Sequence, residues 1–397
     1  MPRSATEHEL ELTIGSLASG GDAVGRATGG RVFFVPFGAP GDRVRIRVLE
    51  ERARFGRGEI VELLSAGPSR TKPECPVFGL CGGCAWQHIR YEAQLEAKRE
   101  ILRSALERLG RLRLPGPIEL VPCPAPYRYR ARTRVLVEGG RVGYRQRRSH
   151  ALCATRRCPV LVPELDEALE KLGAGAHKPD AGEWELASGE GGAVRVARLG
   201  TSLPGPSHRA LEIRVGDERL EFAPGVFVQS NRWLRDALAS AVHEAAGSGH
   251  LAIELFAGAG FLTLGLARRF AQVVAVEADA ASCADLARNA QRAGLHNIEL
   301  RAEPAEQAAA KGFGAPPDTV VLDPPRRGLA GEGAAAVCAL RAPRIVYLSC
   351  DPATLARDLA VLCAGGYEIQ QVRGFDLFPQ TAHVEALTTL VRDSARS

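Results

Sequence analysis

The stretch that decides the fold reads LAIELFAGAGFLTLGLARRFAQVVAVE and spans residues 251–277. Its first six residues form an apolar run that predicts a buried strand. The alanine–glycine turn at 257–260 then leads into the segment 261–270, which predicts a helix. A further apolar run, 273–277, ends in Glu277 and predicts the next strand. Strand, tight turn, helix and strand in this order indicate a doubly wound parallel α/β sheet.

The acidic residue at the end of the second strand indicates what the glycine turn binds. A G-x-G turn by itself is a weak indication, because many α/β proteins need glycine where a strand folds tightly into a helix. Glu277 strengthens the prediction, since carboxylates at this place bind the ribose hydroxyls of nucleotide-like cofactors. The pattern therefore favours a nucleotide-like cofactor at the turn.

Three motifs downstream of this unit carry reactive groups. Cys350 ends the apolar run 345–350 and is followed by Asp-Pro, so the thiol stands where a strand gives way to a loop. Such strand ends carry ligand sites in open α/β sheets. Asp323 begins an Asp-Pro-Pro-Arg motif, and Glu385 closes the segment Thr-Ala-His-Val-Glu. Together they supply a nucleophile, an acidic strand end and a carboxylate that can act as a base.

A cluster of cysteines in the first half of the chain forms a second motif. Cys75, Cys81 and Cys84 read C-x5-C-G-G-C, and either Cys158 or Cys153 supplies a fourth thiol. Ten cysteines in a chain without an export signal argue against a disulfide framework. Four thiolates bind zinc or an iron–sulfur cluster, and spacing alone does not separate the two. The remaining cysteines are expected to be core or surface residues: Cys123, Cys283, Cys338 and Cys363.

The N-terminal part of the chain predicts a small antiparallel barrel. Residues 9–64 alternate polar and apolar side chains between clusters of glycine and proline. Arginines fall on the outward positions: Arg43, Arg45, Arg47, Arg52, Arg54 and Arg57. They form either a phosphate-tracking surface for nucleic acid, which we favour, or a solvated strand face.

Two further segments complete the central part. Residues 91–109 carry apolar side chains at helical spacing and predict a helix. Residues 127–134 read YRYRARTR, which places arginines on one face of a strand beside aromatic residues. This combination suits RNA, through phosphate pairing and base stacking.

Composition limits the class of protein. The chain has 397 residues and 45% hydrophobic content, enough for two or three domains. A net charge of +5 says little about nucleic acid. Residues 1–8 lack the apolar core of a signal peptide, and no run approaches the roughly 18 apolar residues of a membrane span. We expect a cytoplasmic monomer with no membrane segment.

These motifs together resemble the uracil-C5 RNA methyltransferases, which form 5-methyluridine, over nearly the whole chain. The cysteine loop and the N-terminal barrel resemble the 23S rRNA branch in particular, and tRNA is the less favoured substrate. The resemblance implies an OB-like TRAM β-barrel over 1–66 and an α+β region with a 4Fe-4S cluster and RNA contacts over 67–225. It implies a Rossmann-like class I methyltransferase domain over 226–397 that uses S-adenosylmethionine.

The resemblance also implies roles for individual residues. Cys350 matches the nucleophile that adds to C6 of uracil, Glu385 the base that removes the C5 proton, and Asp323 a catalytic and cofactor-site carboxylate. The cofactor site it implies contains Gln229, Phe256, Gly258, Gly260, Phe261, Glu277, Glu303 and Asp323. Many relatives have Asn or Thr where this chain has Phe261, and Glu303 aligns only approximately. The cluster ligands it implies are Cys75, Cys81, Cys84 and Cys158.

Three other classes fit parts of the sequence. An exocyclic-amine methyltransferase would use an Asp-Pro-Pro motif but would not need Cys350, and it normally has an aromatic residue where Arg326 stands. A radical methylthiotransferase would carry a C-x3-C-x2-C signature, which the sequence lacks. A non-catalytic RNA-binding protein would bind RNA without methyl transfer.

Overall fold

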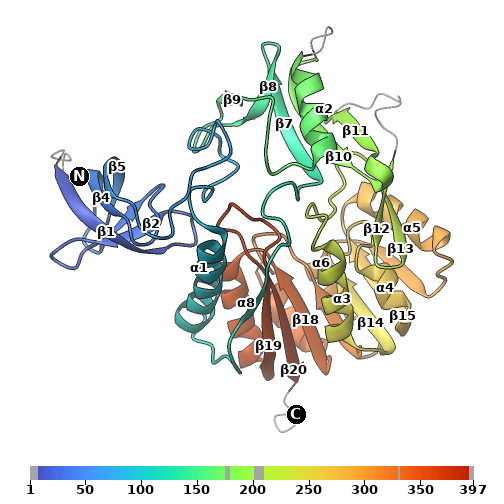
Figure 1. The fold of residues 1–397 in the computed structure, drawn as a ribbon. Helices are drawn as coiled ribbons and strands as arrows, with labels where there is room; N and C mark the ends of the chain where they lie inside the picture. Colours follow the sequence, from blue (N-terminus) through green and yellow to red (C-terminus); the bar gives the residue numbers. More distant parts are fainter. Residues whose placement is uncertain (1–7, 175–178, 201–209, 330, 393–397) are drawn as a thin grey trace.

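The computed structural model describes residues 8–174, 179–200, 210–329 and 331–392. Residues 1–7, on which the expectation of no export signal depends, lie outside the described residues. Figure 1 shows an N-terminal barrel, a central region with its own sheet and a C-terminal sheet covered by helices. None of the described helices is long and apolar enough to cross a membrane.

The N-terminal segment forms the predicted barrel. Its five strands close in the order β1-β2-β3-β5-β4, and every neighbouring pair is antiparallel except β3 with β5. The strands are β1 (Glu9–Leu17), β2 (Ala23–Arg26), β3 (Val32–Val35), β4 (Arg43–Glu51) and β5 (Phe55–Ser65). Alternate apolar residues of β4 point inward, and Gly56 lets β5 cross Phe33, where a Cβ would lie 2.3 Å from the ring. The sequence alternation therefore identified this domain.

Carboxylates neutralise most of the outward arginines of the barrel. Arg45 lies between Glu11 and Glu62, at 3.1 and 2.5 Å, and Arg47 lies 3.1 Å from Glu59. The other pairs are Arg43 with Glu11, Arg52 with Glu50, and Arg57 with Glu50 and Asp22. This face has the charge pairing of a solvated strand surface, the alternative that the sequence left open.

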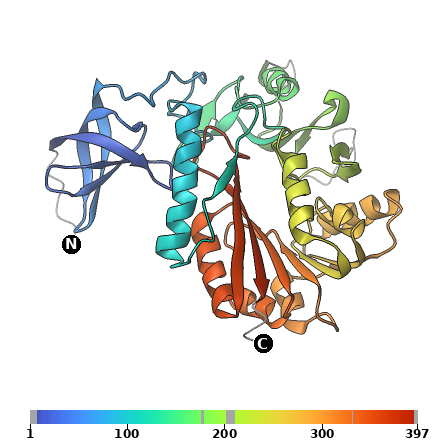
Figure 2. The ribbon, with the colours of Figure 1, turned by 60° about the horizontal axis from the view of Figure 1, so that its bottom comes forward.

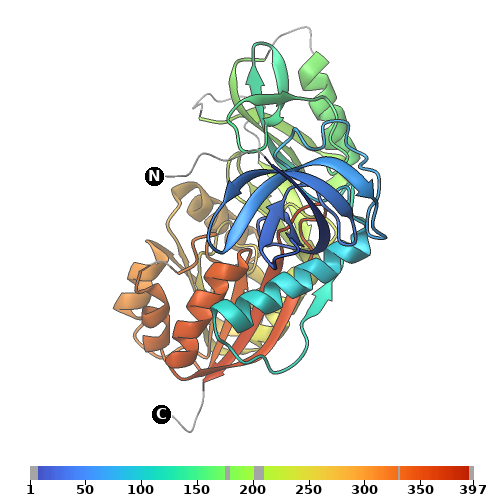
Figure 3. The same cartoon turned by 90° about the vertical axis from the view of Figure 1, so that its left-hand side faces the viewer.

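Helix α1 (Tyr91–Ser104) continues into a π-helical turn, Ala105–Leu109, and confirms the predicted helix. It lies between the barrel and the C-terminal sheet, as Figures 2 and 3 show. Its buried face includes Ile101 and Leu102, together with the polar residues Gln94 and Lys98. Buried polar groups on a helix require partners, and both of these find them on the C-terminal sheet's loops.

The central region is built on a five-stranded sheet in the order β11-β10-β7-β8-β9. Its elements are β7 (Arg132–Glu138), β8 (Arg141–Arg145), β9 (Leu152–Ala154), β10 (Gly182–Ser188), β11 (Val194–Arg198) and helix α2 (Pro163–Ala174). A hairpin of β12 (Leu211–Val215) and β13 (Glu218–Phe222) follows. Regular strand begins only at Arg132 because Arg128 has φ 54°, which breaks the alternation predicted over 127–134.

The C-terminal sheet has eight strands in the order β16-β15-β14-β17-β18-β20-β19-β6. Five are parallel: β14 (Gly249–Leu255), β15 (Phe270–Glu277), β16 (Ile298–Ala302), β17 (Thr319–Leu322) and β18 (Arg344–Ser349). β20 (Glu385–Arg392) inserts antiparallel between β18 and β19 (Tyr367–Phe375), and β6 (Glu119–Val121) adds an edge. This arrangement confirms the Rossmann-like fold and places one strand of the central segment in the C-terminal sheet.

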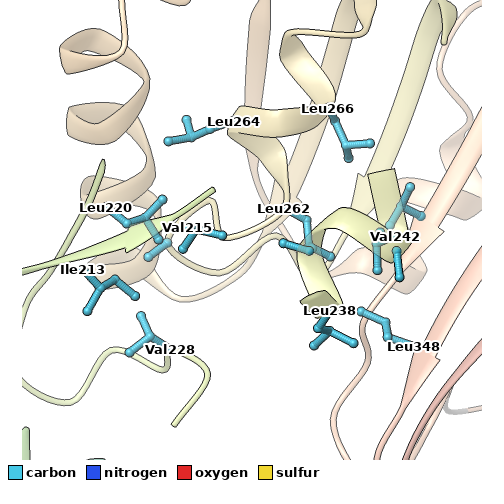
Figure 4. Close-up of a cluster of buried hydrophobic side chains, with 14 of the residues drawn as sticks. Ile213, Val215, Leu220, Val228, Leu238, Val242, Leu262, Leu264, Leu266 and Leu348 are labelled. Atoms are coloured by element: carbon cyan, nitrogen blue, oxygen red, sulfur yellow. The ribbon is translucent and has the colours of Figure 1, made fainter. Parts of the chain in front are cut away.

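Helices cover both faces of this sheet. One buried cluster joins α3 (Arg235–Ala246), α4 (Thr263–Ala267) and the β12–β13 hairpin, and Figure 4 shows Leu238, Leu262 and Ile213 within it. The other cluster joins α1, α6 (Ala305–Lys311), α7 (Gly333–Ala339) and α8 (Pro352–Ala364). α5 (Ala280–Arg292) follows β15. The helix predicted over 261–270 is shorter because the chain turns at Arg269, whose N–H donates to Leu266 O, and Phe270 already belongs to β15.

Candidate active site

Three neighbouring strands bring the predicted reactive residues to one edge of the sheet. Asp323 follows β17 and Cys350 follows β18, so both lie at carboxyl ends of parallel strands. Glu385 begins β20, which runs antiparallel beside β18. The pairing of Ser349 with Ala386, carried one residue further, places Cys350 opposite Glu385. The register thus joins a thiol and a carboxylate that the sequence separates by 35 positions.

The loop after Cys350 is fixed by the start of α8. The Asp351 side chain caps this helix by accepting hydrogen bonds from the N–H groups of Ala353 (3.0 Å) and Thr354 (2.9 Å). The thiol itself is partly buried. Burial, followed by the charge of Glu385, raises the pKa of Cys350 to about 12, whereas Arg326 opposes the rise.

The pKa values of Glu385 and Asp323 are both raised. Glu385 is only 3% exposed, and burial together with the neighbouring Asp323 raises its pKa well above the ordinary value. Burial raises the pKa of Asp323 to about 6. Carboxyl groups with raised pKa values can take up a proton near neutral pH.

Arg326 and His383 complete the immediate surroundings, although the sequence reading gave neither a role. Arg326 Nη2 lies 3.2 Å from His383 Nε2, and its charge acts on both Cys350 and Glu385. Burial and the Arg326 charge lower the pKa of His383 to about 4, so this imidazole is neutral. The signal for both was their place inside the two motifs that carry Asp323 and Glu385.

The glycine turn after β14 has the conformation of a close-approach loop. Phe256, Gly258 and Gly260 have φ values of 67°, 57° and 94°. The Glu277 carboxylate accepts hydrogen bonds from the N–H of Gly258 (2.8 Å) and from those of Ala278 and Asp279. The acidic strand end therefore braces the turn, and its oxygens retain capacity for a further donor.

Two buried polar side chains near this edge lack partners. Gln229 is 6% exposed and its Oε1 accepts no hydrogen bond among the described residues. Glu254, on β14, is 2% exposed, and its Oε2 is likewise unpaired within the described part of the chain. Burial raises the pKa of Glu254 to about 8, and the Asp323 and Glu277 carboxylates add to the effect. Glu254 was missed, although a lone charge inside an apolar strand marks it.

The remaining two candidates have structural partners. Phe261 is partly buried against the hydrophobic cluster that includes α3 and α4. Glu303 follows β16 and forms an ion pair with Lys311 of α6.

The predicted cysteine quartet lines one cavity. Cys75, Cys81, Cys84 and Cys158 all face it, and Cys153, the alternative fourth thiol, does not. Burial raises the pKa of Cys84 to about 11 and that of Cys81 to about 12. None of the ten cysteines forms a disulfide bond. Among the described residues, no three His, Cys, Asp or Glu side chains converge closely enough to hold one metal ion.

A basic pocket of about 350 Å³ lies in the central region, and Val228 and Ser230 line part of it. Its lining includes Arg130, Arg132, Arg134, Tyr144, Phe227 and Phe378. Arg132 is paired with Glu185, but Arg134 is exposed and has no ion-pair or hydrogen-bond partner within the described ranges. Phe227 is 61% exposed. Unlike the barrel face, this pocket keeps free positive charge next to an aromatic ring.

Family models match three parts of the chain. The tRNA (uracil-5-)-methyltransferase model matches residues 315–393, which contain Asp323, Cys350 and Glu385. The TRAM domain model matches residues 6–61, the barrel. A third model, conserved hypothetical protein 95, matches residues 231–343.

Full-length relatives agree with these models. The chain is 36% identical to the 23S rRNA (uracil(1939)-C(5))-methyltransferase RlmD of Chromohalobacter salexigens, over 97% of this chain and 90% of the relative. It is 35% identical to the RlmD of Halomonas elongata, over 99% and 92%. The crystal structure of Pyrococcus abyssi tRNA (uracil-54, C5)-methyltransferase in complex with S-adenosyl-L-homocysteine superimposes with a TM-score of 0.76 at 25% identity, covering 96% of this chain and all of that one. With a thiol and a carboxylate facing each other across β18 and β20, and with relatives of this identity over nearly its whole length, the chain belongs to the uracil-C5 RNA methyltransferase family.

Proposed function

We propose that this protein transfers a methyl group from S-adenosylmethionine to C5 of a uridine in 23S rRNA, through a covalent adduct with Cys350. The observation that carries the proposal is the placement of Cys350 opposite Glu385 at the active edge of the sheet. The rRNA substrate is inferred from the relatives named as 23S rRNA enzymes, which align with the barrel and the cysteine loop as well as with the catalytic domain.

Covalent catalysis is needed because C5 of uracil is too weak a nucleophile to attack a methyl sulfonium unaided. In the proposed first step the Cys350 thiolate adds to C6, and the C5=C6 electron pair becomes enolate density at C5. Arg326 beside the thiol favours the thiolate, which offsets part of the cost that burial imposes. When bound, S-adenosylmethionine supplies the electrophilic methyl group that C5 then takes.

The C5 proton is removed in the second half of the reaction. We assign this proton to Glu385, whose raised pKa suits a base that must accept and later release a proton. The C–H electron pair then re-forms the C5=C6 bond and expels the Cys350 thiolate. Asp323, at the end of β17, places a second carboxylate near Glu385, and its charge contributes to the raised pKa of Glu385. Neutral His383 holds Arg326 by its Nε2 atom.

The methyl donor is assigned to the edge between the glycine turn and Gln229. The positive φ angles at Phe256, Gly258 and Gly260 form a tight turn, and the two glycines, which lack a Cβ, let the backbone approach a ligand closely. The unpaired oxygens of Gln229 and Glu254 are acceptors suited to the ammonium and hydroxyl groups of S-adenosylmethionine. Glu277 is assigned to the ribose hydroxyls, while Phe261 and Glu303 are the weakest members of the predicted set because other contacts occupy them.

The four thiols of Cys75, Cys81, Cys84 and Cys158 are assigned to a 4Fe-4S cluster. These four residues would hold the cluster through their thiolates, as Cys-ligated iron–sulfur clusters require. All four thiols line one cavity, which is the observation that supports the assignment. Arg130 also lines the cavity, and its charge suits four thiolates. Iron and sulfide content, measured on protein purified without oxygen, tests the assignment against zinc.

RNA is assigned to the basic pocket rather than to the barrel's paired face. Arg134 supplies a free cation and Phe227 an exposed ring, which together suit a phosphate and a base. The pocket reaches Phe378, whose ring lies 6.1 Å from that of His383. A strand of RNA held there would therefore pass the mouth of the active site, with the target base extruded toward Cys350.

Covalent trapping tests the mechanism. Wild type, Cys350→Ala and Cys338→Ala are incubated with S-adenosylmethionine and rRNA fragments that carry 5-fluorouridine, whose fluorine cannot leave as a proton. A denaturing gel should show a shifted band for wild type and for the Cys338→Ala control, and none for Cys350→Ala. Methyl transfer to ordinary RNA without any adduct would refute the covalent mechanism and favour an exocyclic-amine methyltransferase.

A further inference from the structure

Most of the hydrogen bonds that hold the loop leading to Glu385 come from outside the 226–397 domain. Residues 376–384 connect β19 to β20 and end at Glu385. Four consecutive backbone carbonyls of this loop accept hydrogen bonds from distant parts of the chain. The donors are Asn231 Nδ2 to Leu377 O (3.0 Å), Lys98 Nζ to Phe378 O (2.9 Å), the Tyr129 hydroxyl to Pro379 O (3.0 Å), and the N–H groups of Ala85 (3.0 Å) and Trp86 (2.9 Å) to Gln380 O.

A buried ion pair anchors the start of the loop. Lys98 Nζ lies 2.5 Å from Asp376 Oδ1, and both side chains are 0% exposed. Asp376 Oδ2 accepts a hydrogen bond from the Tyr91 hydroxyl at 2.8 Å. The sequence contains only five lysines and many more arginines, yet the cation at this fully buried position is a lysine. An ammonium is a more compact cation than a guanidinium. Such a pair contributes little net stability, but it fixes geometry because neither charge tolerates separation.

A pair of hydrogen bonds between Gln94 and Gln380 holds the second half of the loop. Gln94 Oε1 accepts from the Gln380 N–H at 3.0 Å, and Gln94 Nε2 donates to Gln380 Oε1 at 2.9 Å. Gln380 has φ 68°, a conformation that a non-glycine residue keeps only when its surroundings determine it. The chain between Gln380 and Glu385 is also ordered by a hydrogen bond, because the His383 N–H donates to Thr381 Oγ1 at 3.2 Å.

Helix α1 and the segment after Cys84 therefore hold the loop at residues 376–384 in place. Lys98 and Gln94 lie on α1, and Ala85 and Trp86 directly follow the last cysteine of the loop. Lys98 Nζ also lies 5.9 Å from the Trp86 ring centroid, so the two anchors contact each other. In the described part of the chain, the ion pair and hydrogen bonds of the Lys98 and Gln94 side chains go to the loop, Trp86 and Ile89, and none goes to the strand end that carries Cys350.

We propose that Lys98 is a positioning residue for Glu385, acting through Asp376 and the carbonyl of Phe378. This inference rests on the proposed function, in which Glu385 removes the C5 proton. Loss of the ammonium frees the loop and displaces the carboxylate, whereas Cys350 stays on β18. Thiolate addition and methyl transfer then continue, but the C5–H bond breaks slowly, and the methylated Cys350–RNA adduct accumulates on ordinary RNA.

The test compares Lys98→Met with wild type and with Lys171→Met, a control that removes an ammonium from an exposed position on α2 (79% exposed). Three quantities are measured on full-length protein: turnover, adduct on ordinary RNA, and adduct on 5-fluorouridine RNA. We expect Lys98→Met to lower turnover at least tenfold, to keep trapping on fluorinated RNA within about threefold, and to build up adduct on ordinary RNA. Lys171→Met should match wild type in all three.

A second variant separates positioning from stability. Lys98→Met leaves Asp376 buried without its cation, so Lys98→Met/Asp376→Asn removes that charge and should restore the unfolding midpoint without restoring turnover. Unchanged turnover, a parallel loss of turnover and both adducts, or recovery of turnover in the double variant would refute the positioning role. Absence of trapping by wild type would instead refute the covalent mechanism, and with it any role for Lys98 in proton removal.

Discussion

The reactivity of Cys350 in the free protein is the sharpest quantity that the structure predicts. Burial and the Glu385 charge raise its pKa from 9.0 to about 12, against Arg326. That rise corresponds to about 4 kcal/mol against the thiolate. At pH 8 about one thiol in ten thousand is then ionised, compared with about one in ten for an ordinary cysteine of pKa 9.

Neutralising the neighbours should shift this value in opposite directions. Glu385→Gln removes a negative charge beside the thiol, so the Cys350 pKa falls by about one to two units. A less basic thiolate is also a weaker nucleophile, with a Brønsted slope of about 0.45, so alkylation accelerates only about 4- to 13-fold. Arg326→Gln removes the favourable charge and should slow alkylation by a similar factor.

The assay is alkylation of Cys350 by iodoacetamide, resolved from other cysteines by peptide mass spectrometry and measured from pH 6 to 10. The Glu385 pKa is itself raised, so below that pKa the carboxyl is neutral and wild type should coincide with Glu385→Gln. Above it the curves should separate, and the pH of separation reports the Glu385 pKa. Curves that coincide to pH 10, or an Arg326→Gln protein that alkylates faster, would refute the electrostatic account of the site.

Three further predictions concern other parts of the molecule. Arg134→Ala should raise the Kd for rRNA fragments severalfold and make the log–log salt dependence shallower by about 0.7, while Arg45→Ala, which removes a carboxylate-paired cation, changes neither in filter binding. If Arg134→Ala and Arg45→Ala weaken RNA binding equally, the barrel face also binds RNA and the assignment to the pocket alone is wrong. Cys158→Ser should lose the visible absorption and iron of the proposed 4Fe-4S cluster, and Cys153→Ser should keep both; the reverse result exchanges the fourth ligand. Burial opposes ionisation of Asp42, but hydrogen bonds from a neighbouring arginine and two backbone N–H groups outweigh it and lower its pKa. Asp42→Asn should therefore cost about 3 kcal/mol of unfolding free energy in urea at pH 7, a difference that shrinks below about pH 4 as the wild-type carboxylate protonates; a cost that does not change with pH contradicts this.

Local sequence patterns were sufficient for the barrel and the parallel sheet and pointed to the groups at the strand ends, whereas Gln229, Phe256, Phe261 and Glu303 were predicted only through the family resemblance. Period-2 alternation predicted the barrel, and the strand–turn–helix unit at 251–277 predicted the parallel sheet. Cys350 and Asp323 could be singled out because each follows an apolar run and stands beside a proline or polar residues, whereas Glu385 stood out only as the carboxylate that closes the Thr-Ala-His-Val-Glu segment. These signals are local, since they depend on residues within one element and the turn that follows it.

Which residues meet was decided by the tertiary structure. The sequence placed arginines on the barrel surface, but whether they are free depended on cross-strand carboxylates such as Glu11 and Glu62, set by the pairing of β4 with β1 and β5. The β18–β20 register put Cys350 opposite Glu385.

Lys98 shows the limit most clearly. Helical periodicity predicted the helix and places Lys98 on its apolar face, between Leu95 and Leu102, but periodicity does not reveal the partner of the charge. Its partner Asp376 lies 278 positions away. Propensity and periodicity are properties of neighbouring residues, whereas the pairing of two buried charges arises only when distant elements pack and exclude water between them. The sequence alone therefore determined the elements, the fold class and the chemical types at the strand ends, and packing decided the partners, protonation and support of those groups.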